Sequence, residues 1–119
     1  MKWKILIHDA FEKELLHFSE AVQDELMASA RMLEKYGPQL GRPHADTLEG
    51  SKYINMKELR FRADNGVWRV AFAFDPKRQA ILLVAGDKSG VNQNRFYKKM
   101  IKIADKRFSE WMTQIKEGE

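Results

Sequence analysis

The sequence contains no cysteine, and this absence removes several kinds of protein from consideration. Without thiols the chain cannot form disulfide bonds or bind a metal through thiolates, and it fits a cytoplasmic protein. The three histidines, His8, His17 and His44, show no metal-ligand spacing with each other or with nearby carboxylates. The sequence therefore predicts no metal site, and we expect no cofactor.

Long apolar segments are also missing. No stretch approaches the roughly 18 apolar residues that a membrane-spanning helix needs. The apolar run Ile5–Ile7 is too short for the core of a signal peptide, and His8 and Asp9 stop it. A chain of 119 residues, 44% of them hydrophobic, suffices for one core and is short for two. We therefore expect a single domain over residues 1–119, with no membrane partner.

Positive charge is concentrated in the second half of the chain. Residues 52–107 contain fourteen Lys and Arg against five Asp and Glu, a net charge of +9. Residues 1–51 carry −3 and residues 108–119 carry −2. Charge distributed in this way predicts a surface that attracts polyanions such as nucleic acids.

The first third of the chain predicts one strand followed by helix. Trp3–His8 is apolar enough for a strand, and Asp9 with Glu12 resembles a capping box that starts a helix. A second helical segment would begin after Ser19 and end at Gly37-Pro38. The pattern fits either a hairpin of two helices or one bent helix.

The rest of the chain predicts a loop, three strands and a helix. Residues 37–52 are rich in Gly and Pro and are predicted as a loop. Three antiparallel strands follow, two of them joined by a turn at Asp75–Arg78. An apolar stripe from Arg95 to about Lys116 predicts a closing helix. The order predicts an α+β domain with an antiparallel sheet.

Arginines alternate with apolar residues in the predicted strands. Because every second residue of a strand shares a face, Arg60 and Arg62 lie on one side of the first strand. Arg69 shares its face with the small residues Ala71 and Ala73. The small side chains predict a ligand site above an arginine-lined floor. The alternative is that these arginines are solvated residues on an exposed face.

Three segments resemble a known family: GRPHADTLEGSKYINMKELRF, the strand pair GVWRVAFAFDPKRQAILLVAGDK, and the helix start FYKK. Together, over Ile5 to Trp111, they resemble the RelE/ParE superfamily of toxins from type II toxin–antitoxin modules, in its HigB-like, phage-related branch. The resemblance implies a compact RelE-like fold. It also implies a messenger RNA endoribonuclease of the ribosomal A site, or a DNA gyrase inhibitor of the ParE type. The third reading is a non-catalytic nucleic-acid-binding module.

The resemblance also implies roles for particular residues. Arg69 matches the family's strand arginine and would stabilise charge on the phosphoryl group, with Arg60 beside it. Lys88 follows the last strand, where the family has another basic catalytic residue, and Tyr97 would stack on a base or belong to the core. His44 is the remaining histidine near the site and the candidate general base, unless it is a surface loop residue. Further RNA contacts are expected from Lys57, Arg62, Arg95, Lys98 and Lys102.

The expected partners follow from the same resemblance. A cognate antitoxin, of the helix-turn-helix type, would hold the toxin inactive in the cytoplasm. The messenger RNA and the ribosomal A site would be its targets. Operator DNA would be contacted only through the antitoxin.

Overall fold

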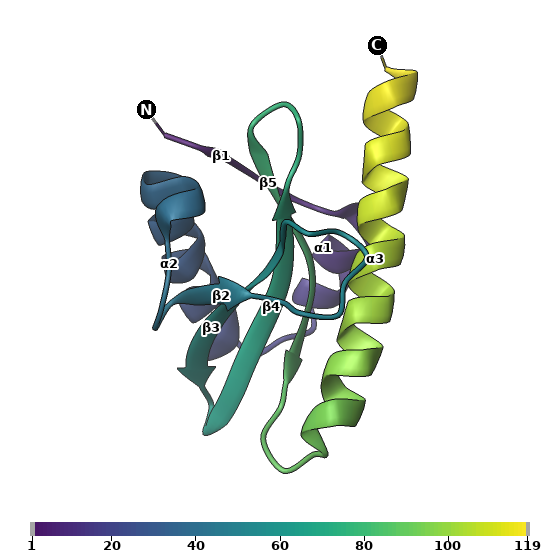
Figure 1. The fold of residues 1–119 in the computed structure, drawn as a ribbon. Helices are drawn as coiled ribbons and strands as arrows, with labels where there is room; N and C mark the ends of the chain where they lie inside the picture. The colour runs from purple at the N-terminus through teal and green to yellow at the C-terminus, as the bar shows by residue number, and fades with distance from the viewer. Residues whose placement is uncertain (1, 119) are drawn as a thin grey trace.

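A computed structural model describes residues 2–118 and consists of one sheet with helices on both faces (Figure 1). Its elements are β1 (Lys4–Ile7), α1 (Asp9–Leu15), α2 (Glu20–Tyr36), a short 3₁₀ helix (Gly37–Gln39), β2 (Ala45–Thr47), β3 (Met56–Ala63), β4 (Gly66–Phe74), β5 (Gln79–Asp87) and α3 (Gln93–Glu117). This order confirms the predicted α+β domain. Within residues 2–118, the helices are all too short or too polar to cross a membrane.

The five strands lie in the order β1-β5-β4-β3-β2. The pairs β3–β4 and β4–β5 are antiparallel, as predicted. Two features differ from the prediction. First, β1 runs parallel to β5, so the sheet is mixed. Second, the predicted loop 37–52 contains β2, a strand of three residues whose only apolar side chain, Ala45, is buried opposite Leu59.

The N-terminal segment forms two separate helices, α1 and α2, rather than the one bent helix that the sequence left as an alternative. The predicted capping box at Asp9 is wrong, because His8 is the N-cap of α1. Its Nδ1 accepts a hydrogen bond from the Ala10 amide at 3.1 Å. Asp9 is instead the first helical residue, where its carboxylate interacts favourably with the positive end of the helix dipole. The predicted Ser19 cap of α2 is confirmed, since its Oγ accepts from the Val22 amide.

Each face of the sheet has its own core. One face packs against α1 and α2 through buried residues that include Leu59, Val70 and Phe72. The other face packs against α3, and here Ala71 and Ala73 lie in one cluster with the helix side chains. The expectation that these alanines leave room for a ligand is therefore wrong. Their small side chains let α3 approach the sheet closely.

A β-bulge in β5 changes which residues face α3. The register between β4 and β5 shifts by one residue, and Leu83 is the extra residue. Leu83 and Val84 consequently both belong to the α3-side core. Beyond the bulge, Gly86 rather than Ala85 lies opposite Arg69. The bulge thus sets which side chains at the end of β5 can approach Arg69.

Candidate active site

Five polar side chains gather where β3 and β4 pass the first turns of α3. We call this group the Arg69 cluster; it consists of Glu58, Arg60, Arg69, Lys88 and Tyr97. The register places Arg60 directly opposite Arg69. Lys88 follows Gly86 by two residues, so the bulge brings it to the same face of the sheet.

Arg69 is buried, with 6% of its surface exposed. Its Nε donates to the Tyr97 hydroxyl at 3.3 Å, and its Nη1 donates to the Trp68 carbonyl at 3.0 Å. Its Nε also lies 3.9 Å from Glu58 Oε1. The alternative reading of Arg69 as a solvated surface residue is therefore wrong. A guanidinium held by fixed partners presents its remaining donors in one defined direction.

Glu58 is a buried carboxylate, 5% exposed, between the two arginines. Within the part of the chain that the structure describes, its Oε1 has no hydrogen-bond partner, and neither has Arg60 Nε, which lies 3.7 Å from Glu58 Oε2. Burial raises the pKa of Glu58, and Tyr97, Arg69 and Arg60 offset only part of this effect. A carboxylate in such surroundings binds a proton more readily than an exposed one.

Lys88 and Tyr97 complete the cluster. Burial and the charges of Arg69 and Arg60 lower the pKa of Lys88, which makes its ammonium a stronger acid. Burial and the Glu58 carboxylate raise the pKa of Tyr97. The Lys88 Nζ lies 5.8 Å from the centre of the Tyr97 ring. The Tyr97 ring packs at the margin of the α3-side core, as one of the two alternatives predicted, and its hydroxyl accepts from Arg69. Stacking of the ring on a base stays a prediction.

A glycine allows α3 to begin close to the sheet. A Cβ atom on Gly86 would lie 2.9 Å from the ring of Phe96, closer than real Cβ contacts allow. Phe96 in turn packs edge-on against Tyr97, with ring centres 5.3 Å apart. The bare backbone at position 86 therefore fixes where Tyr97 stands relative to Arg69.

The other predicted residues of β2 and β3 lie around the cluster or away from it. His44 is exposed at the sheet edge beside Arg60, whose amide donates to the His44 carbonyl at 2.9 Å. Arg62 is exposed at the end of β3 on the Arg60 side. Lys57 lies on the opposite face, where its Nζ is 3.4 Å from the Pro38 carbonyl. The structure therefore separates Lys57 from the cluster.

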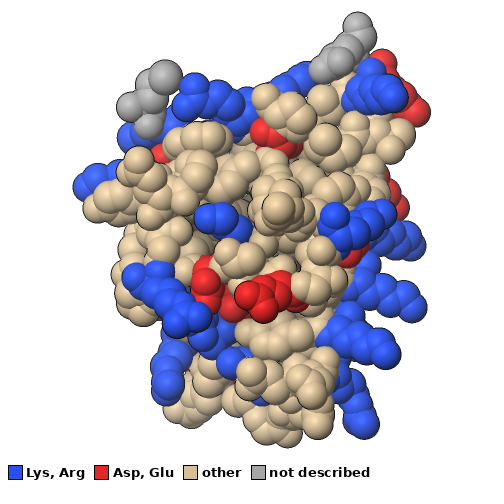
Figure 2. All heavy atoms as spheres, in the orientation of Figure 1, with Lys and Arg blue, Asp and Glu red and all other residues tan. Residues whose placement is uncertain are grey.

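The predicted contacts Arg95, Lys98 and Lys102 belong to α3 and are all exposed. Basic side chains project in a row along the edge of the molecule that α3 forms (Figure 2). These residues form a surface of their own rather than an extension of the cluster.

Sequence reasoning missed Glu58 as a site residue. Its signal was present, because Glu58 is the one acidic residue that alternates with Arg60 and Arg62 in β3. Among residues 2–118, no three His, Asp or Glu side chains come together as a metal site would require.

The family of the chain is shown by comparison with known proteins. The family described as phage-derived protein Gp49-like matches residues 13–109. The chain belongs to this family. The candidate toxins HigB2 and HigB3 of Mycobacterium tuberculosis are 44% and 48% identical to it over 93 and 96 residues. Both matches cover 77% of this chain, but they span 46% of HigB2 and 82% of HigB3.

Two solved structures share the fold. A mutant of Escherichia coli toxin RelE in the free state superimposes with a TM-score of 0.62 at 11% identity, over 86% of this chain and 96% of RelE. A chain of the archaeal RelE–RelB complex from Pyrococcus horikoshii gives a TM-score of 0.55 at 22% identity, over 76% of this chain and 100% of that chain. These two structures confirm the predicted RelE-like fold. The family match and the HigB relatives confirm the predicted HigB-like, phage-related assignment.

Proposed function

We propose that this chain is the toxin of a type II toxin–antitoxin pair and that it cleaves messenger RNA in the ribosomal A site. Relatives named as HigB toxins support the first part. The observation that carries the second part is the Arg69 cluster. It combines a buried carboxylate of raised pKa, two guanidinium groups and an ammonium of lowered pKa on one face of the sheet.

Cleavage of RNA by its own 2′-hydroxyl needs a proton acceptor, cationic groups for the phosphoryl oxygens and a proton donor for the leaving oxygen. The 2′-oxygen forms a bond to the adjacent phosphorus, and the bond from phosphorus to the 5′-oxygen breaks. Glu58, in its ionised form, accepts the proton of the 2′-hydroxyl. The products are a 2′,3′-cyclic phosphate and a 5′-hydroxyl, and the reaction requires no co-reactant and no metal ion.

The basic residues have different tasks in this scheme. Arg69 and Arg60 stabilise the negative charge that develops on the phosphoryl oxygens. Lys88 donates a proton to the departing 5′-oxygen, and its lowered pKa favours that transfer. Tyr97 orients Arg69 through its hydroxyl and offers its half-buried ring to an unpaired base.

Glu58 replaces His44 as the proposed general base. Glu58 lies between both arginines, whereas His44 is exposed at the sheet edge. We therefore expect His44→Gln to retain cleavage and Glu58→Gln to lose it. The opposite result would return the role to His44.

Cleavage of a message on purified ribosomes tests the proposal. The chain should cut at the A-site codon and leave a 2′,3′-cyclic phosphate, and Arg69→Lys should cut the message much more slowly. Arrested growth with DNA breaks that depend on gyrase, and with intact messages, would instead indicate an inhibitor of the ParE type. Binding to ribosomes without any cut would indicate a non-catalytic module.

An antitoxin partner is part of the proposal, because the archaeal RelE structure is a complex with RelB. The neighbouring gene is expected to encode a helix-turn-helix protein. Co-expression of this protein should suppress cleavage, and the protein should co-purify with the chain. Operator DNA should bind only to the complex.

A further inference from the structure

Between Arg95 and Lys106, one face of α3 carries five cations and no carboxylate. Arg95, Lys98, Lys99, Lys102 and Lys106, which we call the α3 ridge, are all exposed, and in the described chain none forms an ion pair. With 3.6 residues per turn, these five residues fall within an arc of about 100° around the helix. Figure 2 shows basic side chains in a row along this edge.

The ridge faces away from the Arg69 cluster. Tyr97 lies roughly 150° around the helix from the middle of the ridge, and Ala104 and Phe108 are buried against the sheet on that same far side. An RNA strand that reaches the Arg69 cluster therefore cannot contact Lys102 or Lys106 from the same position. The ridge requires a different binding partner or a different part of the same one.

The dimensions of the ridge fit a nucleic-acid backbone. Arg95 and Lys106 are eleven positions apart in α3, which corresponds to a length of about 16 Å. One strand of double-stranded DNA carries a phosphate for about every 3.4 Å of its axis, and an A-form RNA duplex places its phosphates at least as densely. A ridge of this length can therefore meet several phosphates of one strand. An uninterrupted row of this length gives strong, additive attraction to one strand.

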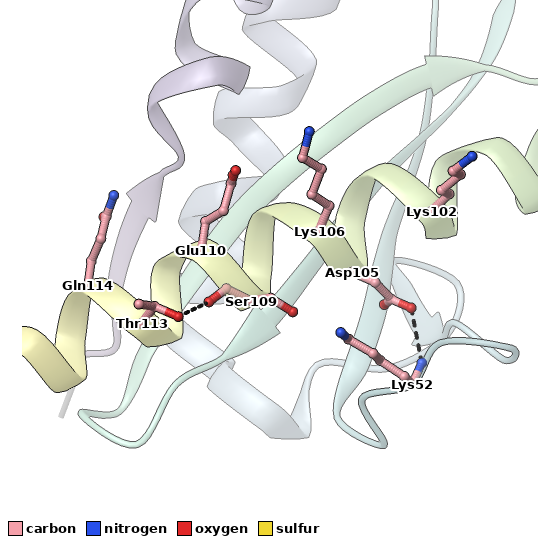
Figure 3. A pocket seen from close by; sticks show the side chains of 8 residues that line it. All are labelled: Lys52, Lys102, Asp105, Lys106, Ser109, Glu110, Thr113 and Gln114. Carbon is pink, nitrogen blue, oxygen red and sulfur yellow. Dashed lines mark hydrogen bonds between the residues drawn. The ribbon is translucent and has the colours of Figure 1, made fainter.

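The ridge lacks the groups that bind unpaired bases. Its exposed positions carry no aromatic side chain, whereas single-stranded RNA is commonly held by stacking. Beside it lies an open hollow of about 770 Å³, and Figure 3 shows Lys102 and Lys106 pointing from α3. Lys52 also lines this hollow, and so do two carboxylates. Asp105 accepts from Ser51 and the Lys52 amide, and Glu110 Oε1 lies 3.3 Å from His8 Nε2. The local chemistry suits phosphates rather than bases.

We infer that the α3 ridge binds the phosphate backbone of double-stranded RNA, and that on the ribosome this RNA is a ribosomal RNA helix. The single-stranded message would occupy the Arg69 cluster on the other side of α3. The identification of the duplex as ribosomal RNA rests on the proposed function, but the inferred binding of duplex RNA does not. Contacts to the backbone give affinity and position without reading sequence.

The test compares two triple variants with the same loss of charge. The ridge variant carries Lys99→Gln, Lys102→Gln and Lys106→Gln. The control carries Lys4→Gln, Lys13→Gln and Lys35→Gln, three exposed lysines outside α3. Affinity for a short RNA duplex of mixed sequence is measured across a range of salt concentrations for both variants and for the unchanged chain.

The ridge variant should lose about 2–3 units from the slope of log affinity against log salt, because each lost phosphate contact removes about one. The control should keep the slope of the unchanged chain. Equal slopes for both variants would overturn the inference. Unchanged duplex binding together with lost antitoxin binding would also overturn it, and would make the ridge an antitoxin surface.

The result can be separated from that of the proposed function. Arg69→Lys should bind the duplex like the unchanged chain, because Arg69 is buried on the far side of α3. If the ridge variant behaves as expected while the unchanged chain cuts no message, only the proposed nuclease activity fails. If cleavage occurs and the ridge slope is unchanged, only the ridge fails.

Discussion

The Arg69 cluster and the α3 ridge both consist mainly of basic residues, but their surroundings differ. Arg69 and Glu58 are buried, and contacts with Tyr97 and Trp68 fix the guanidinium. The residues of the ridge are exposed and unpaired within the described chain. Buried charges change each other's pKa and hold a fixed geometry, which suits chemistry. Exposed charges act additively and are screened by salt, which suits binding.

The largest effect is expected from Glu58→Gln, which keeps the shape of the side chain and removes the base. Loss of a general base lowers the cleavage rate about 10²–10⁴-fold. In the unchanged chain the rate should rise with pH through the raised pKa of Glu58, because only the ionised carboxylate accepts a proton. The pH profile of single-turnover cleavage checks this. If the cleavage rate of Glu58→Gln still rises with pH in the same range, Glu58 is not the general base.

Arg69→Ala should lower the cleavage rate about 10²–10³-fold, by analogy with the loss of an oxyanion donor. The reason is that its guanidinium meets charge that appears mainly in the transition state. Circular dichroism should confirm that the variant is folded, and Arg31→Ala on α2 serves as the control. A folded Arg69→Ala protein that still arrests growth at full strength would place the site elsewhere.

Tyr97→Phe should have a smaller effect, about tenfold or less, because it removes one hydrogen bond to Arg69 and keeps the ring. Tyr97→Ala should cost more, since it also removes the stacking surface and packing against Phe96. Cleavage rates of the two variants on ribosomes check the order. If both variants lose the same amount, the hydroxyl rather than the ring carries the role of Tyr97.

Glu58→Gln should also stabilise the fold at neutral pH. The folded-state pKa of Glu58 is raised above its ordinary value of 4.5, so the folded protein binds this proton more tightly than the unfolded chain does. The free energy of unfolding therefore falls as pH rises through this window. The advantage of the variant should disappear at pH values below 4.5. Urea denaturation of both proteins, at neutral pH and below pH 4.5, checks this prediction. A variant that is less stable than the unchanged chain at neutral pH would show that burial of the Glu58 charge carries no cost.

Much of the fold could be predicted because its signals are local. Ser19 and Gly37 mark the ends of α2, and the apolar stripe of α3 extends over many turns. Other features depend on contacts between distant segments. The parallel pairing of β1 with β5 leaves no mark in β1 itself, and β2 is too short for its alternation to be recognised. His8 was missed as a cap because its ring nitrogen replaces the usual side-chain oxygen.

The candidate site was predictable only where alternation within one strand decides the face. This rule correctly places Arg60 with Arg69 and Lys57 on the other side. It cannot place Lys88, because the bulge in β5 reverses the alternation after Leu83. Glu58 could not be predicted as a site residue, because its proposed role depends on burial between two arginines. That burial depends in turn on the packing of α3 over the sheet.

The division between chemistry and binding is tested most directly by single-turnover cleavage at varied ribosome concentration. Two proteins are compared, Arg69→Lys and the triple ridge variant Lys99→Gln, Lys102→Gln, Lys106→Gln. Arg69→Lys should lower the maximal rate and leave the half-saturating concentration nearly unchanged. The ridge variant should raise the half-saturating concentration and keep the maximal rate. A ridge variant that loses maximal rate at unchanged half-saturation would contradict the account.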